Sequence, residues 1–522
     1  MADKTYDLII VGSGMAGFLL AARIAEKGVN PRNGEPLQVA LVERGPYLRG
    51  TPRPGYGVPE RRRLFTNITS EFHENGRYQM QYYPDGPGGP NTYPHSAGSV
   101  VGGGSLHWRA MTRVPRELDY RAWSEVHDLK DWTPANFKEA ADEVVEMFNI
   151  HSRPDQLLTR GDLLYRDTAK SLGFNVVDSQ VAKKNCLYCW GCEGSNFCKY
   201  DSRRGSFVAY LHLVEKHNVE IIADAEVQKI DIENRRATGV IYEQGGTQQR
   251  IQAPKIIVSC GNFGTPLVLM RSGYGPRELL GSSTLVENPN VGRNIDGRPG
   301  PLVLTGTFPE PMNTGDYVDG GFYVLHDTRQ DRLMERFQLR YENEVLGDPN
   351  RLAINALAPE FGREHKEFMR GICNTEVRSP AKDLLTSRGR ILIRLVRPTQ
   401  VYGSTDQRGT WSYDDRHPSL VPLFQEAREV GHELLRKMGA TEIQETRTPF
   451  GTSFNSNTGS CRAGSDPRTS VINPYFESHD VENLLICDAS ATPMGASIGY
   501  GAPTATVASF AYRRIIERHF SR

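Results

Sequence analysis

Short apolar runs separated by a glycine-rich turn dominate the beginning of the chain. Residues 6–11 (Tyr-Asp-Leu-Ile-Ile-Val) form a nearly continuous apolar run, which predicts a buried parallel strand. Residues 12–17 (Gly-Ser-Gly-Met-Ala-Gly) follow directly, and residues 18–27 have helical spacing. A second apolar stretch covers residues 38–42. The pattern therefore predicts a strand, a turn, a helix and a second strand of one parallel sheet.

The glycine spacing in this turn is typical of a dinucleotide site. Gly12 permits the tight turn, Gly14 lets the backbone approach a pyrophosphate, and Gly17 lets the helix pack against the strand. Free N–H groups at the helix start would hold the phosphates. Glu43 ends the second strand and would accept hydrogen bonds from a ribose, although it lies 43 − 17 = 26 residues after the last glycine, beyond the usual ~20. A polar loop at residues 30–36 accounts for the extra length.

The place of this unit in the chain favours FAD over other dinucleotides. It stands at the beginning of a long chain, as is usual in flavoproteins. Two later segments resemble further strands of the same domain: residues 255–259, which enter a glycine turn, and residues 483–490, which contain Asp488. Asp488 would reach the ribitol or phosphates of the cofactor in one interpretation. In the other interpretation it only caps a loop.

Elsewhere the hydrophobic pattern predicts helices and strands to which we assign no catalytic or binding role. Residues 390–396 alternate as a half-exposed strand does. Residues 133–148 predict a helix with Thr133 as its cap and Pro134 at its first position. Residues 423–438 predict an amphipathic helix.

Composition and charge narrow the class of protein. The 522 residues suggest two to four domains. Lys+Arg and Asp+Glu are both 62, and this zero net charge argues against a nucleic-acid partner. No apolar run approaches the ~20 residues of a membrane helix, and residues 1–5 leave no room for a signal peptide before the first strand. We therefore expect a cytoplasmic protein with a small-molecule substrate.

Several motifs together resemble the glucose–methanol–choline (GMC) oxidoreductase family, and they stand in the family's order. The matching segments are the N-terminal glycine turn, residues 100–108 (Val-Val-Gly-Gly-Gly-Ser-Leu-His-Trp), 259–273, 288–296, 459–467 and the strand that ends at Asp488. The resemblance covers nearly the whole chain. It is strongest to the gluconate dehydrogenase, pyranose oxidase and long-chain alcohol oxidase branches, because of residues 105–108 and 459–462.

The resemblance implies a fold and an activity. The fold is α/β (α+β), with a Rossmann-like FAD-binding domain and a discontinuous substrate domain built on an antiparallel sheet. The FAD-binding domain would comprise residues 1–60, 95–130, 200–300 and 455–522, and the substrate or cap domain residues 61–94, 131–199 and 301–454. The implied activity is that of an FAD-dependent oxidase or dehydrogenase, which passes hydride from a CH–OH donor to flavin N5.

The resemblance also implies cofactor contacts. These would come from Gly12, Ser13, Gly14, Met15, Ala16, Gly17, Glu43, Arg44, Val101, Gly103, Ser105, His107, Val227, Gly261, Asp488, Ala489 and Ala502. Some relatives carry FAD through a covalent bond at the position of His107, and in others that histidine is only packed near the flavin. A helix from Pro503 to Arg518 would direct its positive N-terminal end at the flavin pyrimidine.

The chain departs from the family at the catalytic pair. The usual catalytic histidine stands three residues before the glycine of the G-[ST]-C-R segment, and this position holds Ser456, flanked by Asn455 and Asn457. The partner position holds Ala502. Neither serine nor asparagine has a pKa near neutrality, so neither is a general base alone. Asn457, Ser456 and Tyr500 are the catalytic candidates, although both asparagines could also be turn residues.

Three interpretations follow from this departure. In the first, the enzyme oxidises a CH–OH donor with a base from elsewhere, for which Tyr500, His326, His365 and His417 are candidates. In the second, the fold performs a redox-neutral or atypical flavin reaction, such as an elimination, an isomerisation or oxidation of an acidic C–H. In the third, the protein binds FAD and acts as a partner or scaffold without chemistry.

A cysteine cluster adds a further candidate site. Cys186, Cys189, Cys192 and Cys198 have the spacing C-x2-C-x2-C-x5-C, which suits an iron–sulfur cluster or zinc, or is a loop without metal. Because the chain lacks a haem attachment motif, electrons leaving such a cluster would need an electron-acceptor protein. An NAD(P)-dependent reductase with an iron–sulfur relay is the alternative from another class. It would need a second dinucleotide motif, which the sequence does not contain.

Overall fold

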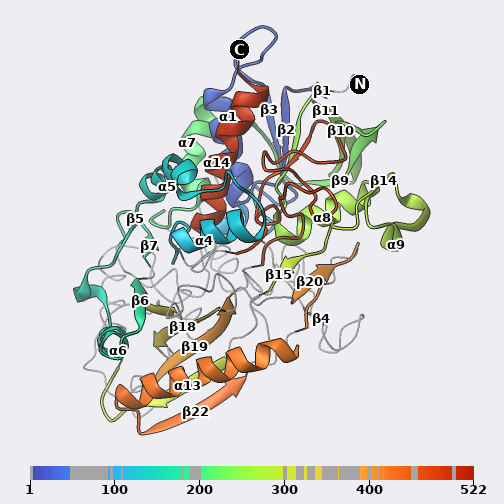
Figure 1. Cartoon of the computed structure of the whole chain (residues 1–522). Helices are drawn as coiled ribbons and strands as arrows, with labels where there is room; N and C mark the ends of the chain where they lie inside the picture. Colours follow the sequence, from blue (N-terminus) through green and yellow to red (C-terminus); the bar gives the residue numbers. More distant parts are fainter. Residues whose placement is uncertain are drawn as a thin grey trace.

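The computed structural model describes most of the chain between residues 4 and 521. The described residues are 4–47, 92–93, 98–106, 108, 110–178, 180–186, 201–297, 302–312, 322–325, 336–343, 363, 388–396, 401–407, 411–414, 417–447, 457–495 and 501–521. Both ends of the chain lie at one end of the molecule, and helix α13 (Val421–Lys437) lies at the other (Figure 1).

A five-stranded parallel sheet lies near the chain termini. Its order is β23-β12-β2-β3-β8. The strands are β2 (Leu8–Val11), β3 (Val39–Val42), β8 (Glu220–Ile222), β12 (Ile256–Val258) and β23 (Leu484–Ile486). Segments from both ends and the middle of the chain thus build one sheet. This is the Rossmann-like arrangement that the N-terminal pattern predicts.

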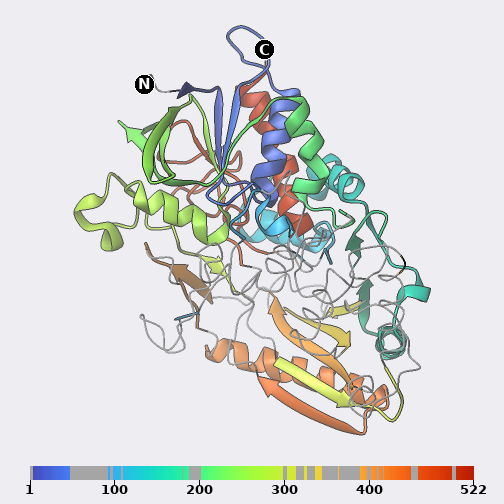
Figure 2. The same cartoon turned by 180° about the vertical axis from the view of Figure 1, so that it is seen from behind.

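Helices cover one side of this sheet, and a second sheet covers the other (Figures 1 and 2). The helices are α1 (Met15–Lys27), α5 (Pro134–Phe148), α7 (Ser206–Lys216) and α14 (Gly501–His519). The second sheet has the order β1-β11-β10-β9, from Lys4–Thr5, Thr247–Gln252, Arg236–Gln244 and Ala225–Glu233. Helix α8 (Gly261–Arg271) packs against β9.

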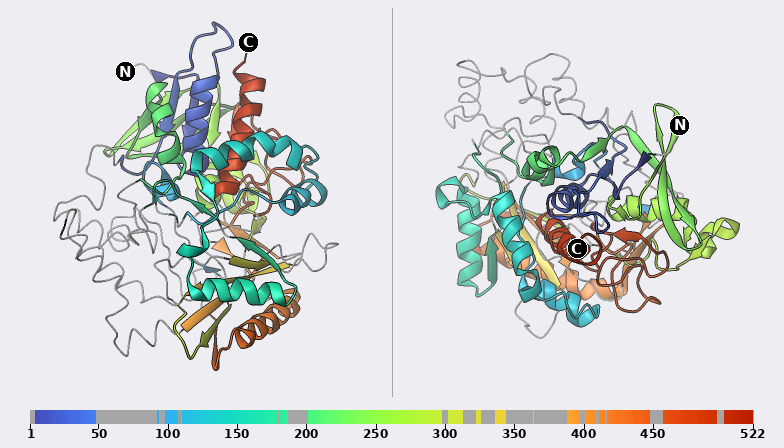
Figure 3. Two further views of the ribbon diagram at one scale, coloured as in Figure 1. Left: turned by 90° about the vertical axis from the view of Figure 1, so that its left-hand side faces the viewer. Right: turned by 90° about the horizontal axis from the view of Figure 1, so that it is seen from above.

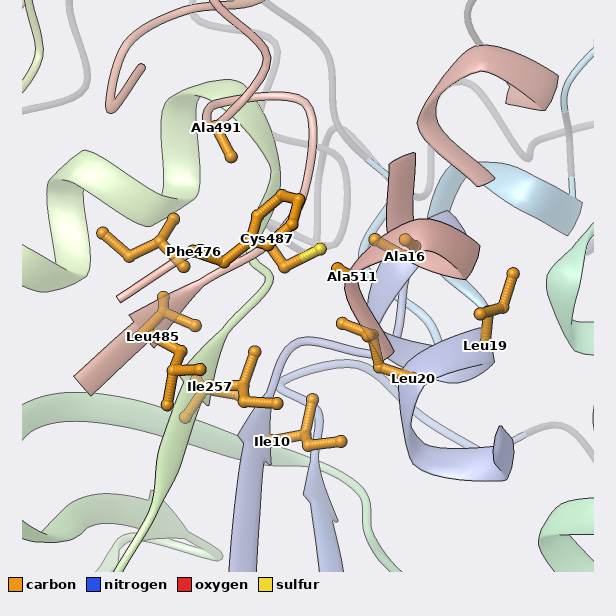
Figure 4. Close-up of a cluster of buried hydrophobic side chains, with 14 of the residues drawn as sticks. Ile10, Ala16, Leu19, Leu20, Ile257, Phe476, Leu485, Cys487, Ala491 and Ala511 are labelled. Atoms are coloured by element: carbon orange, nitrogen blue, oxygen red, sulfur yellow. The ribbon is translucent and has the colours of Figure 1, made fainter. Parts of the chain in front are cut away.

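Apolar side chains from these elements form one core. Ile10, Ile257 and Leu485 are register partners on three neighbouring strands, and all are buried. Figure 4 shows Leu20 of α1 and Ala511 of α14 beside them. Continuous burial on both faces explains why these strands have unbroken apolar sequences.

A six-stranded antiparallel sheet forms the second part of the protein. Its order is β22-β16-β19-β18-β17-β6, from Glu442–Arg447, Leu302–Thr307, Arg388–Val396, Arg336–Asn343, Phe322–Leu325 and Asn175–Asp178. Helices α13 and α6 (Arg160–Ser171) pack against it (Figure 3). Alternate residues of β19, namely Ile391, Ile393 and Leu395, are buried, as the strand prediction requires.

The remaining described elements are short. They are α4 (Glu117–Arg121), a π-helical turn (Ala122–Val126), α9 (Arg277–Leu280), 3₁₀ turns at Gly103–Leu106, Asp155–Leu157, Gly281–Ser283 and Pro418–Leu420, and the strands β4 (Thr92–Tyr93), β5 (Ile150–His151), β7 (Val181–Ala182), β13 (Tyr274–Gly275), β14 (Val286–Glu287), β15 (Ile295–Asp296), β20 (Tyr402–Thr405) and β21 (Trp411–Ser412). Within the described ranges no helix is long and apolar enough to span a membrane.

Most sequence expectations about elements agree with this architecture. The predicted fold class is confirmed, while the proposed domain boundaries stay a prediction. Helix α5 begins as expected, with Thr133 accepting a hydrogen bond from the Asn136 N–H at 3.3 Å. Helix α14 begins earlier than predicted, at Gly501, and includes Pro503 in its first turn, where proline is tolerated.

Candidate cofactor and substrate site

The glycine turn between β2 and α1 needs two of its glycines for steric reasons. Gly12 has φ +93°, and an added Cβ would lie 2.5 Å from the carbonyl oxygen of Ser259. An added Cβ at Gly17 would lie 1.9 Å from the carbonyl oxygen of Gly12. At Gly14 an added Cβ would meet nothing within 4 Å. The space beside Gly14 is therefore open, as a site for an approaching phosphate requires.

The start of α1 offers backbone donors to that space. Gly14 is the N-cap residue and gives no side-chain cap. The first-turn N–H groups, including those of Met15 and Ala16, are at the positive end of the helix. Gly103, at φ +50° in a 3₁₀ turn, comes so close that an added Cβ would lie 2.8 Å from the Cα of Gly14. The second glycine motif thus packs directly against the first.

Glu43 and Ser13 form a buried polar pair behind this turn. The Glu43 carboxylate accepts hydrogen bonds from the Ser13 N–H (3.0 Å) and hydroxyl (2.7 Å), and from the Gly45 N–H (3.0 Å). The Ser13 hydroxyl oxygen also accepts the Gly102 N–H at 3.0 Å. Burial raises the pKa of Glu43, while these hydrogen bonds and the Arg44 charge oppose the rise. Carboxylate lone pairs remain on the oxygen that Gly45 contacts, so a ribose hydroxyl could still donate there.

Asp488 follows β23 and contacts the start of α8. Its carboxylate accepts the Gly261 N–H (2.8 Å), the Thr265 hydroxyl (2.5 Å) and the Ser490 N–H (2.7 Å). Burial raises the pKa of Asp488 against these hydrogen bonds. The aspartate therefore caps α8, which fits the structural interpretation, and it lies at the carboxyl edge of the parallel sheet. Ala489, which follows, accepts the Gly459 N–H at 3.2 Å through its carbonyl oxygen.

Three buried polar side chains near that edge have unpartnered atoms. Asn457 is 5% exposed, and neither its amide nitrogen nor its amide oxygen has a partner. The Thr458 hydroxyl and the Asn262 amide nitrogen are also buried without a partner. Asn262 and the 457–460 segment are joined, because the Ser460 N–H donates to the Asn262 side chain at 3.1 Å. Unsatisfied buried polar groups of this kind fit a site for a polar ligand.

Asn262 was missed in the sequence analysis, which selected only its neighbour Gly261. The available signal was its position directly after the glycine that follows β12. Strand-following positions of parallel sheets point to the edge where ligands bind.

The start of α14 is held by Thr112 and by Trp108, the last residue of the second glycine motif. The Ala502 N–H donates to the Thr112 hydroxyl at 3.1 Å. The indole of Trp108 lies over Gly501, because an added Cβ there would lie 2.1 Å from its Cζ3. Ala502 is fully buried and supplies a backbone donor in place of side-chain chemistry.

The other candidate residues that the structure describes make contacts that stabilise the fold. Val101 and Val227 are buried in the sheet region, and Ser105 donates through its hydroxyl to the Gly102 carbonyl at 2.6 Å. His417 accepts the Ser419 N–H at 3.3 Å and caps the turn before α13.

Several candidates lie outside the described residues. These are the catalytic candidates Ser456 and Tyr500 with Asn455, the possible attachment site His107, the histidines His326 and His365, and the cysteines Cys189, Cys192 and Cys198. Cys186 is described and is partly exposed. In the described part of the chain, no group of three or more His, Cys, Asp or Glu residues could hold a metal ion. The iron–sulfur and zinc hypotheses remain predictions.

Similar proteins span nearly the whole chain. The long-chain-alcohol oxidase FAO4B of Arabidopsis thaliana is 23% identical over 97% of this chain, which spans 66% of that relative's length. The gluconate 2-dehydrogenase flavoprotein of Pantoea cypripedii is 24% identical, covering 98% of this chain and 92% of its own. The alcohol dehydrogenase (acceptor) of Pseudomonas putida is 24% identical, covering 98% and 96%.

Solved structures share the fold at lower identity. Pyridoxine 4-oxidase from Mesorbium loti superposes with a TM-score of 0.65 at 18% identity, covering 97% of this chain and 98% of its own. A formate oxidase superposes with a TM-score of 0.66 at 16% identity, covering 99% of both chains.

Family models agree with these likenesses. The models of the N-terminal and C-terminal parts of the GMC oxidoreductases match residues 6–299 and 404–511. The chain is therefore a flavoenzyme that belongs to the GMC oxidoreductase family.

Proposed function

We propose that the protein is an FAD-dependent oxidoreductase that oxidises a CH–OH group of a small molecule, such as an alcohol or a sugar. The buried, unpartnered amide of Asn457 carries this proposal. It lies beside Thr458, whose carbonyl accepts the Asp296 N–H at 2.8 Å, and two residues before Gly459. An amide held in this way could orient the oxygen of a donor by giving or accepting one hydrogen bond.

The residues around the turn fit FAD. The open space at Gly14 and the start of α1 would hold the pyrophosphate, and Glu43 would bind a ribose hydroxyl. The N-terminal end of α14 would face the flavin pyrimidine and stabilise negative charge there. When bound, FAD accepts the hydride that leaves the donor carbon.

The protein's own side chains would orient the donor, exclude water and take the hydroxyl proton. Asn457 would orient the donor oxygen, and Trp108 would exclude water from the start of α14. The base that takes the hydroxyl proton stays a prediction, with Tyr500, His326, His365 and His417 as candidates. The redox-neutral reaction is the alternative proposal, and it predicts conversion of a substrate without net reduction of the flavin.

The partners and the compartment are also proposals. The substrate is a small molecule, and the electrons leave to oxygen or to an electron-acceptor protein. Comparing turnover with oxygen and with an artificial acceptor dye distinguishes the two. A cytoplasmic location stays an expectation from the sequence.

Anaerobic flavin reduction by a panel of alcohols and sugars tests the proposal. We expect at least one donor to bleach the flavin, and Asn457→Ala to slow that reduction roughly a hundredfold. Asn136→Ala on the exposed side of α5 is the matched control and should react as wild type. An unchanged rate in Asn457→Ala would remove Asn457 from the site. Conversion of a substrate without bleaching would favour the redox-neutral reaction.

A further inference from the structure

The hydroxyl of Ser13 joins segments that lie far apart in the sequence. Ser13 is fully buried in the first glycine turn. Its hydroxyl oxygen accepts the Gly102 N–H at 3.0 Å, and its hydrogen is donated to the Glu43 carboxylate at 2.7 Å. The carbonyl oxygen of Val100, at 3.5 Å, is the weaker acceptor for that hydrogen. A continuous chain of hydrogen bonds therefore connects the second glycine motif through Ser13 to Glu43.

Close backbone contacts surround this chain of hydrogen bonds. An added Cβ at Gly45 would lie 2.1 Å from the carbonyl oxygen of Ser99. An added Cβ at Gly103 would lie 2.8 Å from the Cα of Gly14. The glycine turn, the segment after Glu43 and the second glycine motif thus meet backbone to backbone. Because such contacts cannot be relieved by rotation of a side chain, a displacement of one segment is passed to the others.

The two ends of this chain of hydrogen bonds lie in different parts of the proposed cofactor site. Glu43 would bind a ribose hydroxyl. At the other end, the 3₁₀ turn Gly103–Leu106 connects Gly102 to Trp108. The indole of Trp108 covers Gly501 at the start of α14, the helix end proposed to face the flavin. The serine hydroxyl therefore connects the part of the site for the nucleotide to the part for the flavin.

We infer that Ser13 is a positioning residue that couples the two parts of the FAD site, so that a nucleotide and a flavin strengthen each other's binding. The inference rests on the FAD site of the proposed function and is independent of the reaction that the flavin performs. A nucleotide that fixes Glu43 also fixes the Ser13 hydroxyl and, through it, the segment that ends at Trp108. The second ligand then meets an ordered site, and its binding costs less conformational entropy.

The test measures this coupling with the two halves of the cofactor, in the full-length protein freed of FAD. ADP carries the adenosine and both phosphates, and riboflavin carries the ring and the ribitol. Saturating ADP should raise the affinity for riboflavin at least about fivefold, and riboflavin should raise the affinity for ADP by the same factor. Halves that bind independently would overturn the inference and leave the FAD site intact. Because this measurement uses the wild type, it stands even if a substitution at Ser13 prevents folding.

Ser13→Ala removes the link and leaves the nucleotide end in place. The Glu43 carboxylate keeps the backbone N–H of residue 13 and that of Gly45, both at 3.0 Å, whereas the Gly102 N–H loses its acceptor. We expect this variant to bind ADP alone as the wild type does, while the coupling disappears. Coupling that persists in Ser13→Ala would mean that the two halves contact each other directly, and loss of all ADP binding would assign the hydroxyl to the nucleotide itself. Either result would overturn the inference.

Ser272→Ala is the matched control. Ser272 is also a buried serine, whose hydroxyl accepts the Ile230 N–H at 2.8 Å and donates to the Val268 carbonyl at 2.6 Å. It follows the last turn of α8, outside the segments that Ser13 joins. This variant should lose a similar amount of stability in urea and keep the wild-type coupling between ADP and riboflavin. Loss of the coupling in both variants would show a general effect of destabilisation and overturn the role of Ser13.

Discussion

The carboxylate of Glu143 on α5 connects four helices, and its removal should destabilise the FAD-binding part of the protein. It accepts hydrogen bonds from Arg23 of α1 (2.6 Å), Tyr210 of α7 (3.2 Å), and Ser509 and Tyr512 of α14 (2.7 and 3.0 Å). It also forms an ion pair with Arg513 of α14 (2.9 Å). Helices α1 and α14 both direct their first turns at the proposed cofactor site. Glu143 therefore helps to fix the spacing between the two turns.

The size of the expected loss of stability follows from the burial of the ion pairs that Glu143 forms. The Glu143 side chain is 9% exposed and that of Arg23 is 13% exposed. Removing one partner of a buried pair leaves an uncompensated charge and costs about 3–5 kcal/mol. Arg513 is 29% exposed, so solvent offsets part of its loss. We expect Glu143→Ala to lower the free energy of unfolding by about 3–5 kcal/mol. Glu139→Ala, whose side chain is 86% exposed and 3.7 Å from Arg513, should cost less than about 1 kcal/mol.

The stabilisation that Glu143 provides should decrease at low pH. Burial raises the pKa of Glu143, but the Ser509 hydrogen bond and the charges of Arg23 and Arg513 outweigh burial and lower the pKa below its ordinary 4.5. Such a group stabilises the folded state above pH 4.5, and this stabilisation is lost as pH falls through the lowered pKa. Urea unfolding should therefore separate wild type from Glu143→Gln fully at pH 7 and less below pH 4.5. A separation that is the same at every pH, or Glu143→Ala as stable as Glu139→Ala, would refute the reasoning.

Three further substitutions test other parts of the fold. Gly17→Ala would place a Cβ 1.9 Å from the Gly12 carbonyl oxygen, so the purified protein should contain little FAD by absorbance, and full loading would contradict the close packing. Phe510→Ala removes a ring stacked on Phe137, with centroids 3.9 Å apart, and should cost about 3–5 kcal/mol in urea unfolding; a loss under about 1 kcal/mol would argue that the contact is loose. Asp488→Asn keeps the shape of the cap on α8 but replaces one acceptor oxygen by an NH2 group that would face a donor, and should cost about 1–3 kcal/mol; an unchanged unfolding midpoint would show that one carboxylate oxygen is sufficient for the cap.

The sequence predicts those features that depend on neighbouring residues. The turn from Gly12 to Gly17 is local, because its strand, glycines and helix are contiguous, and the structure places each glycine where its role requires. Strand β19 and helix α13 are likewise visible as hydrophobic periodicities. Family motifs supply the order in which distant segments join the parallel sheet.

Features that depend on residues far apart are not predictable in the same way. Glu143 appears in the sequence as an ordinary helix residue, because its partners come from three other helices. The Asp488 cap on α8 joins residues 227 positions apart. Burial, which makes both arrangements energetically significant, is a property of the fold alone.

The anaerobic absorption spectrum of the purified protein, before and after addition of alcohols and sugars, tests the central claim most directly. The account predicts a two-band flavin spectrum that bleaches when a donor is added. A protein that neither contains nor takes up FAD would contradict the account, as would a bound flavin that stays oxidised with every donor under anaerobic conditions.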